Sequence, residues 1–139
     1  MINKFAEVYG TPDKYIVIVG DYSKNINFKG KEPTINKKIR DLLRNAGYTV
    51  YLIDEFKTSK LCNKCEHLCE NFLEVPSKKP WKKGKNELCW GLIRCNNEKC
   101  NLIHNRDTNA SLNMFKIVQN IMDGKGRPKA YKRDEKIGG

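Results

Sequence analysis

The first third of the chain alternates between apolar segments and polar breaks. Residues 1–9 carry apolar side chains at helical spacing, and a Gly-Thr-Pro stop follows them. Residues 15–19 form a continuous, mostly β-branched apolar run, which predicts a strand that is buried on both faces. A polar loop over residues 22–32 then leads to Pro33, which suits the first position of a helix.

That helix is expected to have one apolar face, formed by Ile35, Ile39, Leu42, Leu43 and Ala46. Gly47 ends it, and residues 48–53 alternate in the manner of a second strand. A strand, a helix and a strand in this order predict a parallel pair with a right-handed crossover, and therefore an α/β fold. A last helix is expected from Asp107, with its apolar stripe at Ala110, Met114, Ile117, Val118 and Ile121.

Between these elements lie four cysteines in two closely spaced pairs. Cys62 and Cys65 stand in CNKC, and Cys95 and Cys100 stand in CNNEKC. Each pair can close a tight turn around one metal ion, and four thiolates at such spacing predict a tetrahedral zinc site. The first residues, MINKFAEVYG, lack the features of a secretory signal, so we expect an intracellular, reducing compartment and no disulfides.

The remaining sulfur and imidazole groups leave alternatives open. A four-ligand site does not require Cys69 and Cys89. They could be buried thiols, replacement ligands or a second pair. His67 and His104 also lie within reach of the cysteines. The sequence favours the flanking CNKC and CNNEKC pairs as the ligands.

Acidic residues flank the cysteine module. Asp54 and Glu55 precede it and Asp107 follows it, so closure by zinc would bring these carboxylates together. Asp21 and Glu55 follow the ends of the predicted parallel strands, where open α/β sheets bind ligands. Asp107 is expected on the core-facing side of its helix. The alternatives are an N-cap for Asp107, a turn residue for Asp21 and a solvated pair for Asp54 and Glu55.

The charge of the chain indicates a polyanionic partner. Lys and Arg outnumber Asp and Glu by 27 to 16, which gives a formal charge of +11. Between the cysteine pairs, Trp81 stands among lysines that suit phosphates, while its indole suits a base; a merely solvated loop is the alternative. These lysines are Lys78, Lys79, Lys82, Lys83 and Lys85.

The end of the chain is also basic. From Gly124 onward it carries Lys125, Arg127 and further cations with little apolar content, which predicts a tail that is mobile until it meets an anion. No apolar run approaches the roughly 20 residues that cross a bilayer, so a membrane partner is not expected.

The sequence resembles a known family in three motifs, DEFKTSKLCNKC, CNNEKC and NRDTNASLNMF. Two further segments, VIVGDYS and GKGRPKAYKR, match more loosely. The family comprises the transposon-encoded RNA-guided nucleases called TnpB and their eukaryotic and viral relatives called Fanzor. The resemblance is to their C-terminal part and covers most of residues 15–133. It implies a partial RuvC-like, RNase H-type domain over 1–59 and 104–123, a zinc ribbon with a lysine-rich insert over 60–103, and a basic tail over 124–139.

The resemblance also implies chemical roles. Asp107 matches the final catalytic aspartate, and Glu55 matches a glutamate beside the TSK motif; Asp21 is the weaker candidate because VIVGDYS has no glutamate. Mg²⁺ at these carboxylates, DNA as target and a guide RNA are then expected. The family's first catalytic aspartate belongs to a preceding half that we do not find before residue 15. We therefore expect a truncated, decayed or split endonuclease, and the alternative is a stand-alone, inactive zinc-ribbon protein that binds nucleic acid.

Overall fold

The computed structural model describes residues 1–21 and 35–133, with the side chains of residues 35 and 36 left aside. The chain divides into two compact units, Met1–Asp54 and Glu55–Gly139. The predictions of a polar loop over 22–32 and of a helix start at Pro33 lie outside the described residues. None of the described helices is long and apolar enough to span a bilayer.

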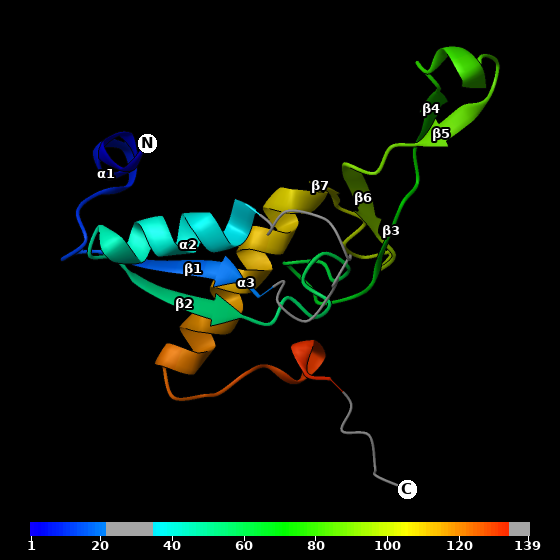
Figure 1. Ribbon diagram of the computed structural model, residues 1–139. Helices are drawn as coiled ribbons and strands as arrows, with labels where there is room; N and C mark the ends of the chain where they lie inside the picture. The colour runs from blue at the N-terminus through cyan, green and yellow to red at the C-terminus, as the bar shows by residue number, and fades with distance from the viewer. Residues whose placement is uncertain (22–34, 134–139) are drawn as a thin grey trace, which may run out of the picture. The chain divides into compact units, whose positions relative to one another are not determined.

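The first unit is a small α/β arrangement. Its elements are α1 (Ile2–Tyr9), β1 (Ile16–Gly20), α2 (Ile35–Asn45) and β2 (Thr49–Ile53). The two strands pair in parallel, with Val17 opposite Val50 and Gly20 opposite Ile53. Figure 1 shows α2 lying along this two-stranded sheet. The sequence prediction of an α/β fold is therefore confirmed at the level of its elements.

The burial of β1 differs from the prediction. None of its residues is fully buried, and 49% of Ile16 is exposed. The reason is that, among the described residues, β2 is the only strand that pairs with β1. The buried apolar residues of the unit lie instead on α2, on β2 and between them, at Leu43, Tyr48 and Ile53. The Tyr48 hydroxyl donates to the carbonyl of Gly10 at 2.6 Å, which ties β2 to the end of α1.

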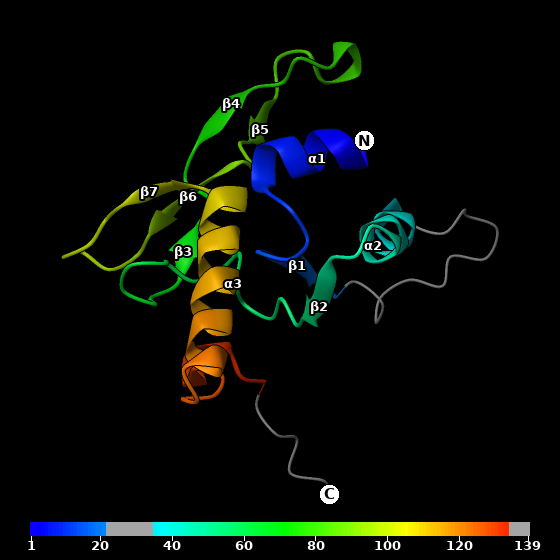
Figure 2. The ribbon, with the colours of Figure 1, turned by 90° about the vertical axis from the view of Figure 1, so that its left-hand side faces the viewer.

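The second unit holds short strands and the longest helix. Its elements are β3 (Cys69–Glu70), β4 (Glu74–Pro76), η1 (Pro80–Lys82), β5 (Asn86–Leu88), β6 (Leu92–Cys95), β7 (Ile103–Asn105), α3 (Arg106–Met122) and η2 (Lys129–Tyr131). The strands β3, β6 and β7 form one antiparallel sheet, and β4 and β5 form a separate hairpin. Figures 1 and 2 show this hairpin standing away from the three-stranded sheet.

The buried side of α3 is mostly polar. Asn109, Asn113 and Ile117 are its fully buried residues, spaced four apart, whereas 49% of Ile121 from the predicted apolar stripe is exposed. The Asn113 side chain donates to the carbonyls of Thr58 and Leu61, both at 2.7 Å. Buried amides are tolerated where they are hydrogen-bonded, so α3 is held to the segment before Cys62 by specific bonds as well as by apolar packing.

The C-terminal segment packs against the same helix. Tyr131 is fully buried, and its hydroxyl donates to Asn113 Oδ1 at 2.7 Å. Arg127 Nε in turn donates to the carbonyl of Tyr131 at 2.8 Å. The prediction of a mobile tail is therefore wrong for residues 124–133. One buried aromatic side chain anchors a segment whose average composition is polar.

Candidate metal centre and nucleic-acid surface

The first pair of cysteines lies in a tight turn that backbone hydrogen bonds close. The amide of Cys62 donates to the carbonyl of His67 at 2.8 Å, and the amide of Glu66 donates to the carbonyl of Cys62 at 2.9 Å. Glu66, directly after Cys65, takes the left-handed backbone conformation with φ of 62°. The reversal after Cys65 lets both thiols face the same point.

The second pair repeats this arrangement. The amide of Cys95, the last residue of β6, donates to the carbonyl of Leu102 at 2.9 Å. Asn101, directly after Cys100, is again left-handed with φ of 43°, and its amide donates to the carbonyl of Asn97 at 2.7 Å. Asparagine tolerates this conformation better than most residues. Two similar turns thus present two thiols each.

The four predicted thiols come together. The Sγ atoms of Cys62, Cys65, Cys95 and Cys100 all lie within 4.8 Å of one another, with Cys62–Cys100 at 3.8 Å and Cys65–Cys95 at 3.4 Å. Four sulfurs at about 2.3 Å from a tetrahedral zinc ion are about 3.8 Å apart. The cluster therefore has the size and the donor set for one zinc ion.

Because the four thiols lie so close together and are buried to different degrees, the pKa values of Cys65, Cys95 and Cys100 shift. Partial burial disfavours the Cys65 thiolate, but hydrogen bonds from the His67 amide and from the neighbouring thiols outweigh it and lower its pKa to about 6. Burial raises the pKa of Cys95 to about 12 and also raises that of Cys100. Four adjacent thiolates repel one another, so a divalent cation is required to hold them all deprotonated.

The other candidate ligands lie outside this cluster. Cys69 and Cys89 are half-buried free thiols that do not belong to the four-sulfur group, and burial raises the pKa of Cys69 to about 11. His104 on β7 has its Nε2 atom 3.2 Å from Cys62 Sγ, within hydrogen-bond reach of a sulfur. An N–H donated to a ligand sulfur orients it and balances its charge.

Asp107 lies in the first turn of α3 and is exposed. The expectation that it faces the core is wrong, since the buried side begins at Asn109, about 200° further round the helix. The N-cap alternative is also corrected. Asn105 is the cap, and its Oδ1 accepts from the amides of Asp107 at 3.1 Å and Thr108 at 3.0 Å.

The remaining candidate carboxylates are divided between the units. Glu55 is half-buried in the second unit, and its carbonyl accepts from the amide and the hydroxyl of Thr58 at 3.1 and 2.9 Å. Asp21 belongs to the first unit, where its amide extends the β1–β2 ladder by donating to Ile53 at 2.8 Å. The catalytic roles of Glu55, Asp107 and Asp21 stay predictions.

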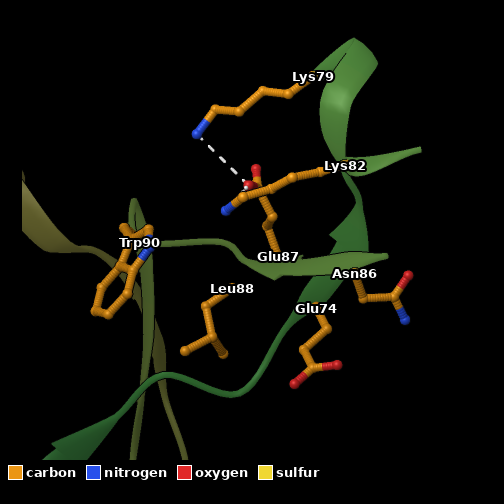
Figure 3. A pocket seen from close by; sticks show the side chains of 7 residues that line it. All are labelled: Glu74, Lys79, Lys82, Asn86, Glu87, Leu88 and Trp90. Atoms are coloured by element: carbon orange, nitrogen blue, oxygen red, sulfur yellow. Dashed lines mark hydrogen bonds and ion pairs between the residues drawn. The ribbon is translucent and has the colours of Figure 1, made fainter. Parts of the chain in front are cut away.

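The lysine-rich insert is the β4–β5 hairpin with η1 at its tip. Figure 3 shows Lys79 and Lys82 converging on Glu87, with nitrogen–oxygen distances of 3.5 and 2.8 Å. We call these three residues the lysine clasp. The other lysines of the insert are exposed, and the described part of the chain gives them no ion pair: Lys78, Lys83 and Lys85. Trp81 at the tip is 77% exposed.

The fold and the site define a small α/β protein that carries a four-cysteine ribbon. A protein-family model described as "Cas12f1-like, TNB domain" matches residues 34–114, which is more than half of the chain. The chain belongs to this family. The match begins before α2 and ends within α3, and it contains all four clustered cysteines. The resemblance to TnpB-like proteins is thereby confirmed at the family level, while no curated protein matches the sequence.

Proposed function

We propose that this chain is a zinc-ribbon nucleic-acid-binding protein and the C-terminal portion of a TnpB- or Cas12f-like, RNA-guided DNA endonuclease. The observation that carries the proposal is the gathering of four thiols within 4.8 Å inside the segment that the family model matches. The formal charge of +11 adds an attraction for nucleic acid that does not depend on sequence.

Zinc has a structural part in this proposal. Bound by four thiolates, it would cross-link the segment after Leu61 to the β6–β7 turn and leave no open position for a substrate. The hairpin between the cysteine pairs would then project from a fixed base. Three of its lysines, Lys78, Lys83 and Lys85, have no ion pair among the described residues and are suited to phosphate contacts, whereas Lys79 and Lys82 are already engaged by Glu87.

The catalytic part of the proposal rests on the family resemblance. Glu55 and Asp107 would be the residues that hold Mg²⁺ in a RuvC-like, RNase H-type site. Their fit to such a site is poor, because the described residues gather three or more metal-ligating side chains only at the four cysteines. The exposure of Asp107 favours the second candidate, a zinc-ribbon protein that binds nucleic acid without cutting it.

Salt dependence tests the binding function. If about five phosphates are contacted, log affinity for duplex DNA falls against log salt with a slope near −4 to −5. Replacing Lys78, Lys83 and Lys85 with Ala removes three contacts and is expected to flatten the slope by about 3. Fluorescence anisotropy with a labelled duplex, repeated at several salt concentrations, measures both slopes.

A matched variant separates local contacts from net charge. Replacing Lys14, Lys37 and Lys38 with Ala removes the same charge from exposed positions of the first unit, and we expect a smaller change in slope. Equal slopes for the two triple variants would reject the hairpin as the contact surface. Absence of binding by the wild-type chain at low salt would reject the proposed function.

A further inference from the structure

A second tryptophan, which the lysine pattern did not indicate, lies just after the hairpin. Trp90 lies in the connection between β5 and β6, two residues before Leu92, and 61% of it is exposed. Neither tryptophan stacks on an aromatic ring or a cation in the described part of the chain. A single exposed apolar side chain is common on protein surfaces, so the feature that distinguishes Trp90 is the hollow beside it.

Trp90 borders an open pocket of about 420 Å³. Leu88 adds an apolar surface beside the indole, and Glu74 and Asn86 add polar groups (Figure 3). Glu74 stands opposite Leu88 across the antiparallel β4–β5 ladder, so both strands contribute to the pocket. A volume of this size is within the range of pockets that accept small planar groups.

The lysine clasp forms one rim of this pocket. Lys82 Nζ donates to Glu87 Oε1 at 2.8 Å, and this bond lowers the pKa of the Glu87 carboxyl. The clasp joins η1 at the tip to β5, and the amide of Ser77 donates to the carbonyl of Lys85 at 2.9 Å, which extends the hairpin ladder. The pocket is therefore held by backbone and side-chain bonds from both strands.

The charges around the pocket select the class of ligand. Within the pocket, Lys79 and Lys82 are balanced by Glu74 and Glu87, so its interior suits an uncharged, planar group with hydrogen-bonding edges. Outside it, Lys78, Lys83 and Lys85, which have no ion pair within residues 1–21 and 35–133, suit the phosphates on either side of such a group. A nucleobase in a strand combines these features. Only an unstacked base presents a free face to an indole, which excludes the interior of a duplex.

We propose that the Trp90 pocket binds one unstacked base of a single-stranded nucleic acid, with the indole as its stacking surface. This inference rests on the proposed nucleic-acid binding. It adds the site that is used and the kind of nucleic acid that is bound there, a single strand. The clasp lysines then hold the pocket, and the phosphates on either side of the base contact the lysines without ion pairs. DNA and RNA strands offer the same base chemistry, so the experiment includes both.

The first measurement is affinity. Anisotropy compares labelled oligodeoxycytidylate and oligocytidylate of about twelve nucleotides with a duplex of equal length. Trp90→Ala is expected to weaken binding of single strands about fivefold to a hundredfold, the range for loss of one stacked base, and to leave duplex binding unchanged. Trp90→Phe should retain most of the affinity. Phe115→Ala, at an aromatic residue of α3 that is 67% exposed, is the control and should change neither affinity.

The second measurement reports on the contact itself. The chain has two tryptophans, so in Trp81→Phe the emission of Trp90 alone is observed. We expect the oligonucleotide to quench this emission with the same midpoint as the anisotropy change. Binding without quenching, or single-strand affinity unchanged in Trp90→Ala, would overturn the Trp90 site and leave the proposed function standing. Absence of binding to any strand would reject the proposed function itself.

Discussion

Asn113 lies where three segments of the second unit meet. Its amide nitrogen donates to the carbonyls of Thr58 and Leu61, and its amide oxygen accepts from the Tyr131 hydroxyl. Asn113 and Tyr131 are both fully buried, so water cannot replace a lost partner. Removing one hydrogen-bonding atom at such a position lowers the free energy of unfolding by more than an average hydrogen bond contributes to it.

Tyr131→Phe tests this junction at the residue scale. The substitution keeps the ring but leaves Asn113 Oδ1 without its donor, and we expect a loss of about 1–3 kcal/mol in the free energy of unfolding. Tyr51→Phe, at a tyrosine that is 57% exposed, should change stability by about 0.5 kcal/mol or less. Urea denaturation with zinc present measures both. Equal midpoints for the two variants would contradict the assigned bond.

The same phenol predicts a pH dependence in alkali. Burial raises the pKa of Tyr131 from 10.0 to about 12, so the folded chain keeps the phenol proton more strongly than the unfolded chain does. Its contribution to stability is fully present below pH 10 and is lost as the pH rises toward 12. The stability difference between the wild type and Tyr131→Phe should therefore shrink or reverse over this interval. Urea midpoints at pH 9, 10 and 11 measure this, and a constant difference would contradict the raised pKa.

At the scale of elements, the ribbon has little apolar material of its own. Its strand β3 has two residues, and its buried apolar residues apart from the cysteines are Leu61 and Ile93. Structural zinc contributes about 10–16 kcal/mol in small domains, which is comparable to the whole stability of a typical domain. The β3–β6–β7 sheet should therefore depend on the metal.

Metal removal tests this dependence. We expect one zinc per chain, loss of ribbon structure on chelation, and loss of zinc in Cys95→Ser, because three thiolates hold the ion more weakly than four. Cys89→Ser is the matched control, since this thiol lies outside the four-sulfur group and its replacement should leave the zinc content unchanged. Metal analysis and hydrogen exchange of the purified proteins provide the readouts. Zinc retained in Cys95→Ser would reject the ligand set.

At the scale of the whole molecule, nucleic-acid binding and DNA cutting make different demands. Binding needs a basic surface on a stable support, which the formal charge of +11 and the ribbon can supply. Cutting by two divalent ions needs several oxygen ligands for each ion. Glu55 and Asp107 are two carboxylates, and Asp107 is exposed.

We therefore predict that residues 1–139 alone bind DNA but do not cut it specifically with Mg²⁺ or Mn²⁺. The assay incubates labelled single-stranded and duplex DNA with the wild-type chain and with Asp107→Ala. Both proteins should leave the DNA intact. Metal-dependent cutting by the wild type that Asp107→Ala abolishes would contradict the prediction and support a complete catalytic site in this chain.

The sequence by itself determined the features that depend on neighbours along the chain. Apolar spacing located α1, α2 and α3, the β-branched run located β1, and the CNKC and CNNEKC spacings selected the four thiols that meet. Such features follow from local geometry, because a tight turn or one helical face is specified by a few consecutive residues.

Only the tertiary structure decided which polar groups are buried and which charges are paired. Asn109 and Asn113 look like exposed positions in a hydropathy pattern, yet they are buried because carbonyls about 50 residues earlier in the chain accept their bonds. The five lysines of the insert look equivalent until Glu87 engages two of them. Whether a polar residue is buried depends on partners that are remote in sequence, and packing alone brings those partners together.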